Sequence, residues 1–86
     1  MTYRVEFVRS AATSYSRLDP LLRRRVDREL LRLSEMPRHP GVIRLQSDDA
    51  IYRVRIGDLR LLFSVEDPVL VVLILKIGHR GSMYRT

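Results

Sequence analysis

Three arginines surround a Gly-Asp pair in the segment YRVRIGDLRLLF. Arg53 and Arg55 precede the pair at alternating positions, and Arg60 follows it. A guanidinium group keeps its charge at any physiological pH and binds phosphate through paired, planar hydrogen bonds. Three such groups held close together would bind a phosphate and stabilise additional negative charge that develops on it.

A second group of polar side chains follows the most apolar run of the chain, VLVVLIL. The segment KIGHRGSMYRT supplies a further set of cations, an imidazole and a phenol: Lys76, His79, Arg80, Tyr84 and Arg85. An imidazole can exchange protons near neutral pH, and a phenol can stack on a base or share a proton. Each residue alone would be an ordinary surface residue, but together, beside an arginine face, they favour a phosphate or nucleic-acid site.

The position of the three arginines depends on a hairpin. Gly57-Asp58 between two alternating runs predicts a two-residue turn, which sets Arg55 opposite Arg60 and Tyr52 opposite Phe63. The apolar side chains then form the core face: Tyr52, Val54, Ile56, Leu59, Leu61 and Phe63. The arginines share the other face with Leu62. Directly opposed like charges destabilise a hairpin, so this arrangement favours an anion site over the alternative, a solvated sheet face.

The remaining elements are predicted from periodicity and turn residues. A strand is expected over 3–8, a short helix capped by Ser10 over 10–18, and a longer helix with Asp19 as N-cap and Pro20 at its first position. Its apolar stripe is Leu18, Leu22, Val26, Leu30 and Leu33. Further strands are expected over 42–46, 51–56, 59–66 and 69–77. The sequence therefore predicts one α+β domain over 1–86: a mostly antiparallel sheet against an N-terminal helical hairpin, in the order β-α-α-β-β-β-β with a short C-terminal tail.

The amino-acid composition indicates which kinds of partner the protein can bind. The net charge is +6, the isoelectric point is about 10.7, and every cation except Lys76 is an arginine, which favours polyanionic partners. The arginines of the longer helix are expected on a solvated face, with i,i+4 pairs from Arg23 to Asp27 and from Arg25 to Glu29. There is no cysteine, no signal-peptide pattern and no apolar run long enough to span a membrane, so a cytoplasmic protein without a membrane partner is expected.

The segments YRVRIGDLRLLFSVED and VLVVLILKIGHRGSMYR resemble the RelE-type toxins of bacterial type II toxin–antitoxin systems, within the RelE/ParE superfamily. The resemblance implies a RelE-like fold and a ribosome-dependent endoribonuclease that cleaves mRNA in the ribosomal A site. The family's basic pair falls on Arg53 and Arg55, its arginine after the turn on Arg60, its arginine after the last strand on Arg80, and its C-terminal tyrosine on Tyr84. The best-studied pattern has lysines at the basic pair.

The mechanism implied is a metal-independent transesterification in which the RNA 2′-OH attacks the adjacent phosphorus. The basic face offers no cluster of carboxylates or histidines for a divalent cation, so neither a metal nor a cofactor is expected. The residues assigned to catalysis are Arg60, Arg80, Tyr84 and His79. His79 is our addition, because a guanidinium is a poor proton acceptor. The residues assigned to RNA or phosphate binding are Arg53, Arg55, Lys76, Arg85 and Arg44.

The resemblance also implies partners. These are a cognate antitoxin, expected to be acidic and to carry an amphipathic helix, and the ribosome with its mRNA and rRNA. Operator DNA would be contacted only through the antitoxin complex. Two alternatives stay open: a ParE-like toxin that inhibits DNA gyrase by binding without nuclease activity, and a basic module whose only role is to bind an antitoxin or a transcription partner. ParE-type relatives generally lack the Arg/Tyr set, which favours the nuclease.

Overall fold

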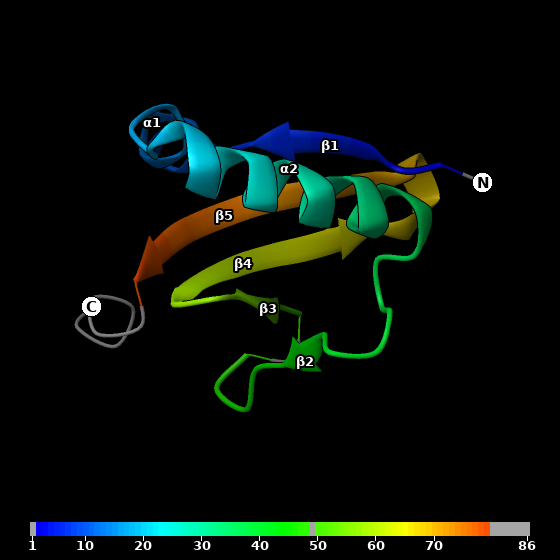
Figure 1. Cartoon of the computed structure of the whole chain (residues 1–86). Helices are drawn as coiled ribbons and strands as arrows, with labels where there is room; N and C mark the ends of the chain where they lie inside the picture. Colours follow the sequence, from blue (N-terminus) through cyan, green and yellow to red (C-terminus); the bar gives the residue numbers. More distant parts are fainter. Residues whose placement is uncertain (1, 49, 80–86) are drawn as a thin grey trace.

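The computed structural model describes residues 2–48 and 50–79, and Figure 1 shows how its elements are arranged. The elements follow one another in the expected order: β1 (Arg4–Phe7), α1 (Arg9–Ser16), α2 (Pro20–Glu35), β2 (Ile43–Arg44), β3 (Tyr52–Ile56), β4 (Leu59–Glu66), the 3-10 turn η1 (Asp67–Val69) and β5 (Val71–His79). The two helices lie together over one face of the sheet (Figure 1). The α+β class predicted from the sequence is confirmed.

The sheet has five strands in the order β1-β5-β4-β3-β2. All neighbours are antiparallel except β1 and β5, which are parallel, with Arg4 opposite Val71 and Phe7 opposite Ile74. β5 therefore lies inside the sheet, between β1 and β4. Its two faces differ in burial: Val72 and Ile74 are buried in the core, whereas Leu73 and Leu75 are half-buried.

The β3–β4 hairpin has the register expected from its turn. Arg55 lies opposite Arg60, Val54 opposite Leu61 and Tyr52 opposite Phe63. The predicted core face is buried throughout: Tyr52, Val54, Ile56, Leu59, Leu61 and Phe63. Val26 and Leu33 of α2 are also buried and belong to the same cluster, so the helix stripe and the hairpin face form one core.

The two helices begin differently. Asp19 caps α2 as predicted, because its carboxylate accepts hydrogen bonds from the backbone N–H groups of Leu21 and Leu22 at 3.0 and 3.1 Å. The expected cap of α1 is wrong. α1 begins at Arg9 after Val8, whose side chain has no oxygen to accept a bond, and Ser10 lies inside the helix, where its carbonyl accepts from the Ser14 hydroxyl.

Two strands differ from the prediction in their bounds. β2 has only two residues, where 42–46 had been expected, and it pairs with β3 only at Tyr52 and Arg53. β5 is shifted from 69–77 to Val71–His79. The cause is the turn before it, where η1 and a left-handed Leu70 (φ 53°) use residues that periodicity had assigned to the strand.

Candidate functional site

A cavity of about 350 Å³ lies beside the β3–β4 hairpin, and we call it the arginine cavity. Residues from α2, from the loop before β2 and from both hairpin strands line it: Glu29, Arg32, His39, Pro40, Gly41, Ile43, Arg53, Val54, Arg55 and Arg60. Its volume is in the range of small-molecule sites, roughly 300–1,000 Å³. Four of the lining residues are arginines, so the cavity suits an anion.

The three hairpin arginines differ in exposure. Arg55 is exposed and Arg53 is half-buried, whereas Arg60 is only 7 % exposed. The sequence analysis placed all three on one face of the hairpin and did not distinguish their burial. A guanidinium removed from bulk water interacts more strongly with a phosphate than one on the surface, because water screens it less. Arg60 is therefore the cation of the cavity best placed to stabilise charge on a bound group.

The register of β5 decides which of its polar residues join this face. Lys76 lies opposite Leu62, and Leu62 lies opposite Arg53, so these three form one row across the sheet. Gly78 lies opposite Arg60, in the next row. His79 is the last residue of β5 and lies opposite Leu59, a core residue. Alternation therefore assigns Lys76 to the arginine face and His79 to the other face.

The other predicted site residues are Arg44, Arg80, Tyr84 and Arg85. Arg80, Tyr84 and Arg85 are outside the described residues. Arg44 is at the surface in β2, where its guanidinium donates a hydrogen bond to the Tyr52 hydroxyl at 3.1 Å and lies 5.5 Å from the centre of that ring. It is not one of the residues that line the arginine cavity.

Tyr52 is held by two arginines. Arg38 donates through Nε to the same hydroxyl at 3.0 Å, and its guanidinium lies 5.4 Å from the ring centre. The hydrogen bonds from Arg38 and Arg44 lower the pKa of Tyr52 because they favour the charged phenolate. The ring also stacks on Phe63, with 5.8 Å between ring centres. Arg44 thus has a structural role at this ring.

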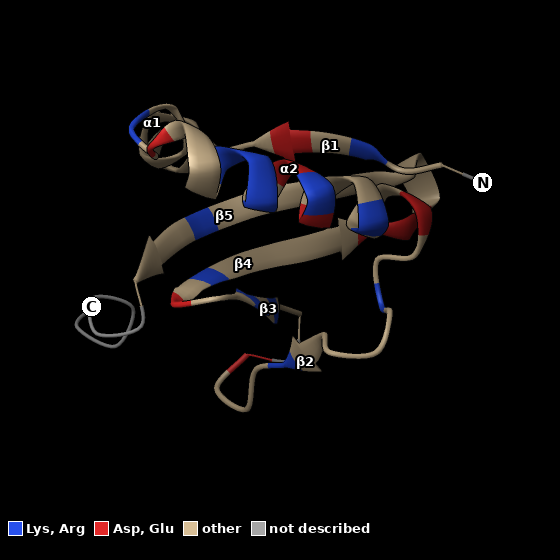
Figure 2. Ribbon diagram, in the orientation of Figure 1, with Lys and Arg blue, Asp and Glu red and all other residues tan. Residues whose placement is uncertain are grey.

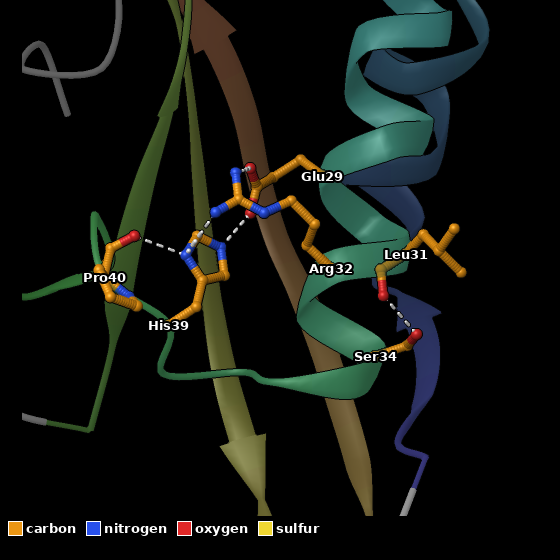
Figure 3. Close-up of polar contacts among 6 residues, drawn as sticks. All are labelled: Glu29, Leu31, Arg32, Ser34, His39 and Pro40. Atoms are coloured by element: carbon orange, nitrogen blue, oxygen red, sulfur yellow. Dashed lines mark hydrogen bonds and ion pairs between the residues drawn. The ribbon is translucent and has the colours of Figure 1, made fainter.

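A buried ion pair forms one side of the arginine cavity (Figure 3). His39 Nε2 lies 2.5 Å from the Glu29 carboxylate, and the two residues are 5 % and 7 % exposed. His39 Nδ1 lies 2.6 Å from the Pro40 carbonyl and 3.3 Å from Arg32 Nη2, and Arg32 Nη1 lies 3.5 Å from the carboxylate. The sequence analysis did not consider His39, and it placed Glu29 on the solvated face of the helix.

One signal for Glu29 was present in the sequence. It lies three residues after Val26 and four before Leu33, within the apolar stripe of α2, where a carboxylate needs a partner. The predicted pairing of Glu29 with Arg25 is wrong, because Glu29 contacts His39 and Arg32 instead. The prediction for Asp27 is wrong in the same way, since Asp27 accepts a hydrogen bond from the Tyr15 hydroxyl. For Glu29, burial was therefore a better guide to its partner than the presence of an arginine four residues earlier.

Among residues 2–48 and 50–79, no three His, Cys, Asp or Glu side chains lie close enough together to hold a metal ion. No helix in this part of the chain is long and apolar enough to cross a membrane. The cations are spread over α2 and the hairpin, as Figure 2 shows, and the arginine cavity lies where these two elements meet.

Comparison with known proteins shows which family the chain resembles. Residues 5–84 match the family model described as the ParE toxin of the type II toxin–antitoxin system parDE. Comparison with curated protein sequences gave no match. Among solved structures, the chain is similar to the toxin in the archaeal RelE–RelB complex from Pyrococcus horikoshii, with 34 % identity, coverage of 94 % of this chain and 98 % of that one, and a TM-score of 0.72.

Two bacterial structures are also similar. The RelBE2 toxin–antitoxin complex from Mycobacterium tuberculosis matches with 26 % identity, 94 % coverage of each chain and a TM-score of 0.82. The isolated RelE toxin of E. coli matches with 23 % identity, coverage of 90 % of this chain and 83 % of that one, and a TM-score of 0.80. At that identity the last match shows the fold alone. The family match and these structures lead to one conclusion: the chain belongs to the ParE toxin family of type II toxin–antitoxin systems, within the RelE/ParE superfamily, and has the fold of RelE toxins.

Proposed function

We propose that this toxin is a ribosome-dependent endoribonuclease that cleaves mRNA in the A site and so inhibits translation in the cytoplasm. The observation that carries the proposal is the burial of Arg60 opposite Arg55 in a cavity that Arg53 also lines. Folding alone does not favour two arginines face to face with one of them buried. A site that must stabilise a phosphate with extra charge does favour it.

The reaction is an intramolecular transesterification. The 2′-oxygen of a nucleotide loses its proton and bonds to the adjacent phosphorus, the bond from phosphorus to the 5′-oxygen breaks, and that oxygen takes up a proton. The products are a 2′,3′-cyclic phosphate and a 5′-hydroxyl. Because no water is consumed, the protein has to position the RNA, stabilise charge and move one proton.

The residue roles follow from this chemistry. Arg60, with Arg80, would bind the scissile phosphate and stabilise its five-coordinate state, while Tyr84 would stack on a base or share a proton. His79 would be the acid or base, which requires it to act from the end of β5. The RNA backbone would be bound by the other cations: Arg53, Arg55, Lys76 and Arg85.

The second candidate is inhibition of DNA gyrase by binding, without cleavage. The observation that favours it is the family model, whose description is that of a ParE toxin. Such a toxin would use its cations for contact with a protein or DNA and would not need a buried arginine at a reacting phosphate. The two candidates therefore differ in what happens to mRNA when the toxin is expressed.

Primer extension on a translated mRNA separates them. The toxin, its Arg60→Ala variant and its Arg28→Ala variant would each be induced briefly in cells that lack the antitoxin. We expect new cleavage ends with the wild type and with Arg28→Ala, whose arginine is exposed on α2, and at least about a hundredfold fewer with Arg60→Ala. Growth arrest with intact mRNA would instead support inhibition of DNA gyrase by binding.

An antitoxin partner is supported by the solved relatives, which include RelE–RelB and RelBE complexes. We propose that the cognate antitoxin of this toxin is acidic, since it must bind a chain with a net charge of +6, and that it carries an amphipathic helix. Operator DNA would then be contacted through the antitoxin complex.

A further inference from the structure

The ion pair between Glu29 and His39 holds a proton whose place can be worked out from its contacts. A carbonyl oxygen only accepts hydrogen bonds, so the 2.6 Å contact with the Pro40 carbonyl assigns a hydrogen to His39 Nδ1, in preference to the longer 3.3 Å contact with Arg32 Nη2, which only donates. His39 Nε2 then shares a second proton with the Glu29 carboxylate at 2.5 Å. The Glu29 carboxylate is therefore held by its hydrogen bond to His39.

Stability does not account for such a pair. Both residues are less than a tenth exposed, and burying two charged groups costs desolvation that their attraction only partly returns. Replacing a buried ion pair by apolar side chains of similar volume is often neutral or stabilising. The pair lies at the wall of the arginine cavity, where its charge state affects whatever binds there.

Glu29 is the acidic residue among those that line the arginine cavity, and the cavity otherwise presents Arg32, Arg53, Arg55 and Arg60. A free carboxylate on this wall would repel a phosphate and compete with it for the guanidiniums. In a site shielded from water both effects are stronger than on the surface. The cavity therefore binds an anion better when the Glu29 carboxylate is already engaged by a hydrogen-bond partner.

We propose that His39 is a positioning residue that keeps the arginine cavity open to RNA phosphate by sequestering the Glu29 carboxylate. The choice of RNA as ligand rests on the proposed function, whereas the charge argument applies to any phosphodiester. His39 acts through Glu29 and does not touch the reacting atoms. Its loss would leave the Glu29 carboxylate with only the longer 3.5 Å contact to Arg32, and so available to the other arginines of the cavity.

A purely structural role for His39 is the competing explanation. The backbone carbonyl of His39 accepts a hydrogen bond from the Val42 N–H at 3.0 Å across Gly41, and the chain then enters β2, which pairs with Arg53. His39 could thus shape the loop beside Arg53. The two explanations predict opposite results when both members of the pair are made neutral.

The test is a double-mutant cycle on binding. Fluorescence anisotropy would measure the affinity of the full chain for a short RNA oligonucleotide with 2′-O-methyl groups, which cannot be cleaved by this route. The variants are His39→Gln, Glu29→Gln and the double variant, with circular dichroism confirming that each is folded at the assay temperature. We expect His39→Gln to weaken binding about tenfold, and the double variant to return to within about threefold of the wild type.

Rescue is the decisive result. If the double variant binds as weakly as His39→Gln, or if His39→Gln binds as tightly as the wild type, the proposal is wrong. Should His39→Gln not fold, the double variant and Glu29→Gln still test the charge argument, because both are expected to bind within about threefold of the wild type and weaker binding overturns it.

Cleavage measured in parallel keeps this inference separate from the proposed function. If the double variant recovers binding as expected but the wild type leaves mRNA intact, the nuclease proposal is wrong and the role of His39 stands. If the wild type cleaves mRNA but the double variant does not recover binding, the nuclease proposal stands and the role of His39 is wrong.

Discussion

Asp67 connects three parts of the chain through its carboxylate. It accepts two hydrogen bonds from Arg38 at 2.7 and 3.2 Å and one from the Tyr3 hydroxyl at 2.6 Å. The hydrogen bonds from Arg38, and after them the bond from Tyr3, lower the pKa of Asp67 from 3.8 to about 2. Arg38 in turn reaches Tyr52, so the loop after α2, the start of β1 and the turn before β5 are tied together at one residue.

This contact predicts an acid-sensitive component of stability. Because the pKa of Asp67 is lower in the folded state, its contribution is fully present above about 4 and is lost as the pH falls toward 2. We expect the urea midpoint of the wild type to fall across that window, and Asp67→Asn to lack this part of the fall while being less stable at neutral pH. Asp58→Asn in the hairpin turn is the matched control. A pH profile of Asp67→Asn that parallels the wild type would contradict the assignment.

For single residues, the sequence correctly predicted those features that depend only on nearby positions in the chain. The side-chain direction of Arg53, Arg55 and Arg60 follows from alternation and a two-residue turn, and the register confirms it. The burial of Arg60 and the contact of Glu29 with His39 could not be predicted in this way. The latter joins a helix to a loop ten residues further on, and only the packed structure shows which of the many possible partners is near.

At the scale of elements, the β3–β4 hairpin depends on its turn. Gly57 has a left-handed φ of +59°, and a Cβ added there would lie 3.0 Å from an Arg25 guanidinium nitrogen. The arginine can move aside, so the main cost of a side chain at this position is the backbone conformation. The turn also sets the register that places Arg55 opposite Arg60.

We therefore expect Gly57→Ala to lower the free energy of unfolding by about 1–2 kcal/mol, as measured by urea denaturation. Gly57→Asn should cost clearly less, because asparagine tolerates a left-handed conformation better than alanine does. Equal losses in the two variants would show that contact with Arg25, and not the backbone, decides the cost.

Element type was easier to predict than strand partnership. The long helix, its Asp19 cap and all five strands were expected, since each has its own periodicity and turn signals. The parallel pairing of β1 with β5 was not, because the pairing of strands from opposite ends of a chain leaves no local mark. β2 was overestimated for a related reason: an alternating run shows that a strand is possible, and its length depends on how much of its neighbour it reaches.

At the scale of the whole molecule, charge is divided between two surfaces. The arginine cavity is partly closed, whereas Arg24 and Arg28 of α2 are exposed to solvent. Exposed cations attract any polyanion from a distance, but a cation within a cavity contacts one particular phosphate. The proposed site therefore predicts that the two surfaces contribute differently to RNA binding.

The salt dependence of binding measures this difference. We expect Arg55→Gln to reduce the slope of log K against log salt concentration by roughly 0.7 for a short RNA oligonucleotide, which corresponds to one lost phosphate contact on a single strand. The Arg24→Gln/Arg28→Gln double variant should leave the slope unchanged. A larger change in the helix variant than in Arg55→Gln would place the RNA on α2 instead.

The position of β5 has a consequence for how the protein is made. β1 leaves the ribosome first but has β5 as its partner in the sheet, and β4 also needs β5 on one side. A nascent chain that has not yet been extended through residue 79 can form the helices and the β3–β4 hairpin, but it cannot join β1 to the rest of the sheet. Long-range pairing of this kind is slow and comes late in folding. Synthesis therefore delays completion of the sheet until β5 has left the ribosome.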